Sequence, residues 1–266
     1  MNPPSYLYGT AWKEERTEAC VVAALAAGFR GIDTANQRRH YFEEAVGRGI
    51  AASGIRRDQL YLQTKFTYRG GQDDRLPYDP KAPIAVQVKQ SFDSSLEHLG
   101  VTYIDSFVLH GPSQEGTLGP KDREAWRAME ALVDAGWVGV LGISNVQLSQ
   151  LQELLALARI KPRFVQNRCY ARTGWDKVMR GLCTQHGITY QGFSLLTANR
   201  QVLEHKFVKH VANRWSVTPA QIIFRFAQQV GMLPLTGTSD PIHMREDLDM
   251  RFDLLGEELL AIETAG

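Results

Sequence analysis

Short apolar runs alternate along the chain with longer stretches in which apolar residues recur every three or four positions. The short runs are typical of buried β-strands, and the longer stretches are typical of helices with one buried face. Two of the helical stretches, residues 14–28 and 83–100, end in glycine, as a helix terminus prefers. The predicted strands cover residues 6–11, 31–35, 60–66, 105–111, 138–144, 164–170, 189–196 and 233–238.

This alternation predicts an α/β fold in which helices cover a parallel sheet. Eight strands with about eight helices favour a closed (β/α)8 TIM barrel, and 266 residues is a usual length for one. A doubly wound open sheet is the alternative, but no G-x-G-x-x-G turn follows the first predicted strand. The most irregular stretch, residues 67–83, is a loop rich in Gly, Pro and Asp. We therefore expect residues 1–266 to form a single domain.

Composition and charge narrow the classes of function. The chain is 44% hydrophobic and 22% charged, with a formal net charge of +1 and scattered basic residues. We expect no nucleic-acid partner and no membrane association. No apolar stretch is long enough to span a bilayer, and the N-terminus lacks a signal-peptide pattern. The three cysteines have no metal-like spacing, so we expect a cytoplasmic protein without a metal site.

Polar side chains stand at the ends of three consecutive predicted strands. Asp33 follows the second strand, Lys65 ends the third and His110 ends the fourth, while Tyr41 lies shortly after Asp33. Each has an ordinary structural explanation on its own, such as a turn cap for the aspartate or a solvent-seeking lysine. Because active sites of barrels lie at the carboxyl ends of the strands, the combination indicates a site.

The combination suits proton transfer to a carbonyl oxygen. An ammonium beside a carboxylate stays charged, and it should lower the pKa of a neighbouring phenol below its usual value of about 10. Such a phenol can donate a proton, while a neutral imidazole orients the same oxygen. Since neither a nucleophile elbow nor a metal cage is present, the missing component is a source of hydride.

These residues lie in motifs that resemble the aldo-keto reductases, barrel enzymes that move hydride between NADPH and a carbonyl. The motifs are "GIDTA", "TKF", "FVLHGP", "GISN" and "QGFSLL", and the resemblance runs from "YGTAW" to "REDLDM". It implies an NADPH-dependent reductase that converts aldehydes and ketones to alcohols. Asp33, Lys65 and His110 then match three members of the family's catalytic tetrad, whose fourth member is a tyrosine.

The position of that tyrosine is ambiguous here, because the loop after Asp33 is longer than the family pattern by about two residues. The family's tyrosine position falls on His40, and Tyr41 comes one residue later. Either His40 replaces the acid, or Tyr41 brings its hydroxyl to the same point. We favour Tyr41, because Lys65 would disfavour a protonated His40 but assist a phenol. His40 would then line the loop or the mouth of the substrate pocket.

The resemblance also implies a cofactor site. Ser144 and Asn145 should bind the nicotinamide carboxamide together with Gln166 or Asn167, and Phe193 should stack on the ring. The other residues expected at the cofactor are Gly9, Thr10, Ala11, Ser194, Leu195, Gly237, Thr238, Ser239, His243, Arg245 and Asp247.

Strand eight departs from the family pattern at the cofactor phosphate. Gly237 stands at the position of a common lysine, His243 at that of an arginine, and Asp247 where asparagine often contacts adenine. Amides at Thr238 and Ser239 can still bind a phosphate. We therefore expect NADPH as the cofactor, with NADH as an alternative.

On the substrate side, we expect Trp12, Phe66, Tyr68 and residues 111–117 to wall the pocket. The chain stops at Gly266 without the longer C-terminal loop of narrow-specificity members, so we expect an open pocket and, as is common in the family, a monomer.

Three other functions are weaker alternatives. A nicotinamide-binding regulatory subunit with little turnover is the main alternative. Schiff-base chemistry at Lys65 is disfavoured, because Asp33 would raise the pKa of the lysine. A metal hydrolase is disfavoured because His40 and His110 lack further ligands.

Overall fold

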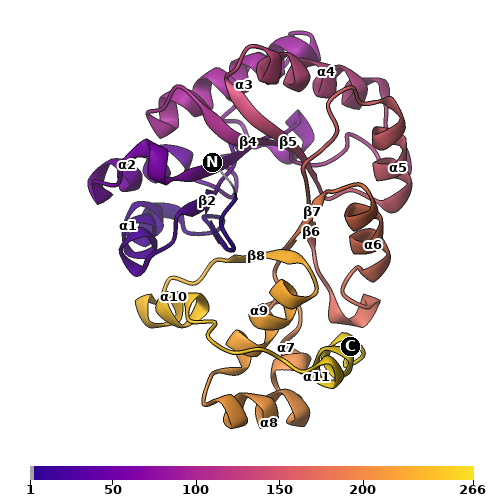
Figure 1. Ribbon diagram of the computed structural model, residues 1–266. Coiled ribbons are helices and arrows are strands. Elements are labelled where there is room, and N and C mark those ends of the chain that lie inside the picture. The colour runs from indigo at the N-terminus through magenta and orange to yellow at the C-terminus, as the bar shows by residue number, and fades with distance from the viewer. Residues whose placement is uncertain (1–2) are drawn as a thin grey trace.

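Eight parallel strands form the centre of the protein, and the first and last of them pair to close a barrel. The computed structural model describes residues 3–266, in which each strand pairs with the next and β8 pairs with β1. Helices surround the strands on the outside (Figure 1). The (β/α)8 barrel predicted from the sequence is therefore confirmed. The strands are β1 (Leu7–Gly9), β2 (Gly31–Asp33), β3 (Tyr61–Phe66), β4 (Ile104–Leu109), β5 (Val138–Ser144), β6 (Phe164–Arg168), β7 (Thr189–Phe193) and β8 (Met232–Thr236).

One α-helix follows each of the strands β1 to β6, three separate β7 from β8, and two follow β8. Among residues 3–266, no helix has the length and apolar composition that crossing a membrane requires. The helices are α1 (Thr17–Ala27), α2 (Glu43–Ser53), α3 (Ile84–Leu99), α4 (Pro120–Asp134), α5 (Leu148–Leu157), α6 (Lys177–Gln185), α7 (Arg200–Leu203), α8 (Lys206–Trp215), α9 (Pro219–Gln229), α10 (Pro241–Leu248) and α11 (Gly256–Glu263).

Most strands end earlier than the apolar runs that predict them. The run 31–35 ends as a strand at Asp33, and the run 189–196 ends at Phe193, whereas β5 covers the predicted residues 138–144 in full. The residues beyond these ends belong to the loops that follow the strands. Polar residues that close the apolar runs therefore lie at the rim of the barrel, where a ligand can reach them.

Alternation along the strands places one set of side chains inside the barrel. Tyr61, Gln63 and Lys65 share one side of β3, and Gln63 contacts Gln191 of β7 at 2.8 Å, although β7 is not a neighbour of β3. That side therefore faces the interior. An apolar cluster fills the interior beneath the polar residues and consists of Leu7, Tyr61, Phe164, Leu233 and Leu235.

Two glycines bring α2 close to its neighbours. A Cβ atom at Gly47 would lie 1.9 Å from the carbonyl oxygen of His98 at the end of α3, and one at Gly49 would lie 2.8 Å from Cβ of Val21 in α1. No larger residue fits at these positions without moving a helix. This tight packing fixes the start of α2, and hence the loop after β2 that carries Tyr41.

Candidate active site

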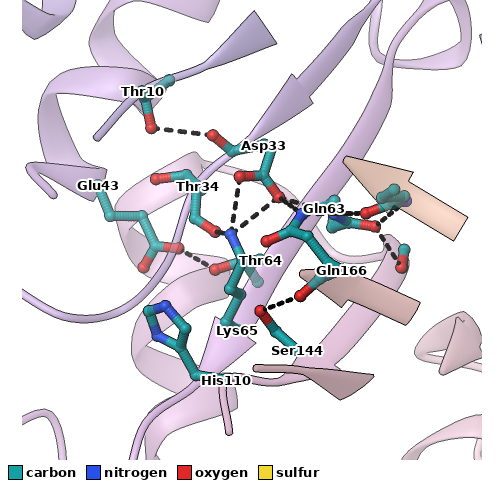
Figure 2. Close-up of polar contacts among 12 residues, drawn as sticks. Thr10, Asp33, Thr34, Glu43, Gln63, Thr64, Lys65, His110, Ser144 and Gln166 are labelled. Carbon is teal, nitrogen blue, oxygen red and sulfur yellow. Dashed lines mark hydrogen bonds and ion pairs between the residues drawn. The ribbon is translucent and has the colours of Figure 1, made fainter. Parts of the chain in front are cut away.

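The ends of β2 and β3 bring a buried carboxylate and a buried ammonium together. Nζ of Lys65 lies 2.8 Å from each carboxylate oxygen of Asp33 and 2.8 Å from the carbonyl oxygen of Thr34 (Figure 2). The side chain of Lys65 is 0% exposed. Three acceptors match the three donors of an ammonium, so the lysine is fully hydrogen-bonded as a cation.

Lys65 keeps its charge despite its burial. Burial alone lowers the pKa of the ammonium, but the charge and hydrogen bonds of Asp33 and the proximity of Tyr41 outweigh it and raise the pKa above its usual value. This agrees with the expectation from the sequence. A Schiff base needs a neutral amine, which this site opposes.

Three glutamines support Asp33 from the barrel interior. Nε2 of Gln63 donates to Oδ1 of Asp33 at 2.7 Å, and Nε2 of Gln166 donates to the same oxygen at 3.0 Å. Gln191 joins both glutamines, and the hydroxyl of Ser106 donates to Gln63 at 2.9 Å. This network, part of which Figure 2 shows, was missed at the sequence level except for Gln166. It fixes the orientation of the carboxylate that holds Lys65.

Tyr41 lies between Lys65 and His110. Nζ of Lys65 is 5.1 Å from the centre of the phenol ring, and the rings of Tyr41 and His110 meet edge to face with centres 5.8 Å apart. The backbone amide of Tyr41 donates to the carbonyl of Gln37. The next helix begins with buried Glu43, which accepts hydrogen bonds from Ser95 and His98 at 3.0 and 3.1 Å. These contacts hold the tyrosine in place.

The expectation of a lowered pKa at Tyr41 is wrong for the protein without ligands. Burial raises the pKa of the phenol, and Asp33 raises it further, while the charge of Lys65 lowers it only in part. Motifs in the sequence reveal the nearby cation, but they do not reveal the loss of water around the hydroxyl. The phenol therefore carries its proton throughout the neutral range, with a cation beside it to stabilise the phenolate.

The side chain of His40 packs against Trp12. Its ring lies over Trp12 with ring centres 4.0 Å apart, and its backbone carbonyl accepts a hydrogen bond from the Trp12 amide at 2.8 Å. Burial and Arg39 lower the pKa of His40. Trp12 has a left-handed backbone with φ of 61° and is 66% exposed. The structure thus places His40 in a wall with Trp12.

Two backbone hydrogen bonds and one side-chain contact hold His110. Its backbone amide donates to Phe66, its backbone carbonyl accepts from Nδ2 of Asn145 at 2.7 Å, and Nδ1 lies 2.6 Å from Oγ1 of Thr67. Burial and the positive charge of Lys65 lower the pKa of His110 to about 3. The ring is therefore neutral at physiological pH, as the sequence interpretation required.

A cavity of about 810 Å³ opens beside these side chains at the rim of the barrel, and we call it the larger cavity. It contains Asp33, Tyr41, His110 and most of the residues expected at a cofactor. Those expected residues are Gly9, Ala11, Ser144, Asn145, Gln166, Phe193, Ser194, Leu195, Gly237, Thr238, Ser239, His243 and Asp247.

Three residues expected at the cofactor lie elsewhere. Thr10 is buried and donates to the carbonyl of Asp33 at 3.0 Å. Asn167 turns away and exchanges hydrogen bonds with the backbone of Val146, so Gln166 is the amide that faces the cavity. Arg245 is exposed on α10, outside the cavity lining. The alternation of sides along β6 separates the two neighbouring amides.

A buried lysine at the larger cavity was missed at the sequence level. Nζ of Lys13 donates to the carbonyl oxygen of Gly237, and a Cβ atom at Gly237 would lie 3.7 Å from this nitrogen. Burial lowers the pKa of Lys13. Arg16 and Arg168 also line the cavity. The position of Lys13, directly after Trp12, was the available signal.

A second cavity of about 590 Å³, the smaller cavity, adjoins the first. His40, His110 and Asn145 line both of them. The expected residue Tyr68 and residues 111–113 of the expected loop line the smaller cavity, whereas Trp12 lines the larger one.

The expectation that Phe66 walls the pocket is wrong. Phe66 is completely buried and packs against Tyr68 and Tyr78 with ring centres 5.2 and 5.7 Å apart. It lies in neither cavity lining. Since Lys65 points into the barrel, the next residue on β3 must point outward.

Comparisons with known proteins agree on one family. The model of the aldo/keto reductase family matches residues 6–265. The glyoxal reductase of Bacillus subtilis is 31% identical over 251 residues, covering 94% of this chain and 83% of the relative. Methylglyoxal reductase DkgA of Yersinia pestis is 28% identical over 252 residues, covering 93% and 83%.

Solved structures show the same architecture. An aldo/keto reductase from Brucella melitensis superposes with a TM-score of 0.84 at 28% identity, covering 99% of this chain and 95% of the other. An aldo-keto reductase from Bombyx mori, solved with NADP, superposes with a TM-score of 0.83 at 24% identity, covering 99% and 89%. No group of three or more potential metal ligands occurs among residues 3–266.

Proposed function

Because the chain belongs to the aldo/keto reductase family, we propose that it is an NADPH-dependent carbonyl reductase in which Tyr41 is the general acid. In this reaction a hydride adds to the carbonyl carbon and a proton adds to the oxygen, which gives an alcohol. The observation that carries the proposal is the position of Tyr41. Its ring lies between Lys65 and His110, while His40 lies against Trp12.

Residues of the chain supply the proton that the carbonyl oxygen receives. Tyr41 keeps its proton at neutral pH because its pKa is raised by burial. When the phenol gives this proton to a developing alkoxide, Lys65 stabilises the phenolate. Asp33 keeps Lys65 charged, and neutral His110 donates a hydrogen bond to the same oxygen. The four residues thus form the tetrad, with Tyr41 in the place of the displaced family tyrosine.

The larger cavity fits a nicotinamide dinucleotide. The side-chain oxygens of Asn145 and Gln166 are available to accept from a carboxamide, and the partly exposed Phe193 offers a ring for stacking. A reduced nicotinamide supplies the hydride when bound. On the phosphate side, Lys13 and Arg16 provide positive charge although strand eight has Gly237 in place of a lysine. These cations support NADPH as the cofactor.

The names of the relatives suggest the first substrates to test. The similar proteins include a glyoxal reductase and a methylglyoxal reductase. The smaller cavity is lined by His40 and His110, adjoins the cavity that contains Tyr41, and is large enough for a small aldehyde. We propose small, reactive aldehydes, including dicarbonyl compounds, as the substrate class.

The test is NADPH consumption with methylglyoxal and 4-nitrobenzaldehyde by the wild type, Tyr41→Phe and His40→Ala. We expect turnover by the wild type, a loss of about 10²- to 10⁴-fold in kcat for Tyr41→Phe, and a retained kcat for His40→Ala. Loss of activity in His40→Ala alone would assign the proton to the imidazole. NADPH binding without turnover of any carbonyl would instead favour a nicotinamide-binding regulatory subunit.

A further inference from the structure

We propose that Thr67 is a positioning residue that holds the proton of His110 on Nε2, the ring nitrogen available to the carbonyl oxygen. The proposal deepens the proposed function, because it names what prepares the imidazole for its role. It starts from one contact, in which Oγ1 of Thr67 lies 2.6 Å from Nδ1 of His110.

A hydroxyl and an imidazole nitrogen can share a proton in two directions. If Thr67 donates, Nδ1 is the acceptor and the neutral ring carries its proton on Nε2. If Nδ1 donates, the hydroxyl hydrogen of Thr67 needs another acceptor. Within residues 3–266, the hydroxyl of Thr67 has no hydrogen-bond partner except His110. Because Thr67 is buried, an unmatched hydroxyl hydrogen is unfavourable. The geometry therefore favours donation by Thr67.

The direction of the threonine side chain is fixed by packing. A Cβ atom at Gly71 would lie 2.7 Å from Cγ2 of Thr67, so the methyl group occupies the space that this glycine leaves. The backbone carbonyl of Thr67 accepts a hydrogen bond from the hydroxyl of Tyr78 at 2.8 Å. With the methyl group and the backbone held, the hydroxyl is left facing His110.

The position of His110 is fixed independently of this contact. Its backbone amide and carbonyl are bonded to Phe66 and Asn145, so Thr67 governs the ring and not the backbone. The ring meets Tyr41 edge to face and lines both cavities. An Nε2 proton is then placed to reach an oxygen that also receives the proton of Tyr41. An Nδ1 proton would leave only an acceptor there, which repels a carbonyl oxygen.

Nitrogen NMR of the ¹⁵N-histidine-labelled protein tests the proposal directly. Coupling patterns of ring protons to the two nitrogens show which one is protonated, and His110→Gln identifies the signal. We expect wild-type His110 at neutral pH to be protonated on Nε2, with Nδ1 as a hydrogen-bonded acceptor. Protonation on Nδ1 would overturn the proposal. This readout does not depend on turnover, so it remains decisive if the proposed reductase activity is absent.

Variants separate positioning from general stability. Thr67→Val keeps the shape and the methyl group but removes the hydroxyl, whereas Thr67→Ser keeps the hydroxyl. We expect Thr67→Val to shift the Nδ1 signal and to lower kcat/KM for an aldehyde by about tenfold. Thr67→Ser should retain the wild-type signal and most of the activity. An unchanged signal and activity in Thr67→Val would contradict the proposal.

An exposed threonine on α6 provides a control. The hydroxyl of Thr184 donates to the backbone carbonyl of Arg180 at 3.0 Å, and Thr184 lines neither cavity. Thr184→Val therefore removes a hydrogen-bonded threonine hydroxyl without touching the site. It should leave the His110 signal and kcat/KM unchanged. If both valine variants lose activity equally while the His110 signal stays constant, Thr67 is merely structural.

Discussion

Nε2 of Gln63 donates a hydrogen bond to Oδ1 of Asp33 at 2.7 Å, the same oxygen that accepts from Lys65. An uncharged amide inside the barrel and the ammonium of Lys65 thus donate hydrogen bonds to the same carboxylate. The glutamine also contacts Gln191 and Ser106, so one side chain joins strands on different sides of the barrel. The site rests on a polar layer whose members depend on one another.

Gln63→Leu should destabilise the protein strongly. It removes partners from Asp33, Gln191 and Ser106 in a fully buried layer. We expect the free energy of unfolding to fall by about 3 kcal/mol, because buried polar groups without partners are costly. Denaturant titration measures this, with exposed Gln152→Leu on α5 as the control. A loss no larger than that of the control would show that the layer rearranges without cost.

Asp247→Asn should stabilise the protein at neutral pH. Burial raises the pKa of Asp247 from 3.8 to about 6, although its side chain accepts a hydrogen bond from Thr236 at 2.6 Å. Between these pH values the folded protein binds the proton more tightly than the unfolded chain. The stabilising contribution of the protonated carboxyl is therefore complete below about pH 4 and is lost as the pH rises through 6.

At pH 7 the ionised carboxylate carries a penalty of at most about 3 kcal/mol relative to the unfolded chain. The uncharged isostere removes this penalty and its pH dependence. Unfolding free energies of wild type and Asp247→Asn at pH 4, 6 and 8 give the answer. The difference in favour of asparagine should grow with pH, and a constant difference would contradict the raised pKa.

Lys13→Gln should weaken the binding of NADPH. Lys13 is buried at the larger cavity beside Gly237, where a family lysine is absent. We expect the Kd for NADPH to rise about tenfold, since a charge-assisted contact is lost. Quenching of protein fluorescence by the cofactor measures this. Lys209→Gln on the exposed side of α8 is the control, and equal effects in both variants would rule out a specific contact.

Carbonyl compounds with a carboxylate should be preferred over uncharged ones. Arg69 and Lys121 line the smaller cavity, and none of its lining residues is acidic. We expect a lower KM for 4-carboxybenzaldehyde than for its methyl ester, with a difference that shrinks at high salt. Lys121→Gln should raise the KM for the acid a few-fold and leave that for the ester unchanged. Equal KM values for acid and ester in the wild type would refute the charge preference.

The sequence predicted which residues stand at the ends of the strands. Asp33, Lys65 and His110 could be placed together because parallel strands end at one rim of a barrel. The partners of Asp33 could not, because Gln63 and Gln191 lie on strands that are far apart in sequence. Alternation shows that Gln63 points inward, but it does not show which side chain it meets there.

Two predictions from the sequence are wrong for different reasons. Alternation along β3 places Phe66 opposite Lys65, so its outward direction can be read from the sequence. The sign of the pKa shift at Tyr41 cannot be read in this way, because it depends on how completely the loop after β2 excludes water from the hydroxyl. Charges near a group can be inferred from motifs, whereas burial has to be seen in the folded molecule.

The wall formed by Trp12 and His40 would couple binding in the two cavities if a ligand moved it. The Trp12 amide donates a hydrogen bond to the His40 carbonyl. Trp12 lines the larger cavity, and His40 lines both cavities. A ligand that shifts this wall from one side changes the affinity on the other, and linkage requires the effect to be reciprocal. Under the proposed function, a substitution at this wall would therefore alter the affinities for the cofactor and for the carbonyl compound together.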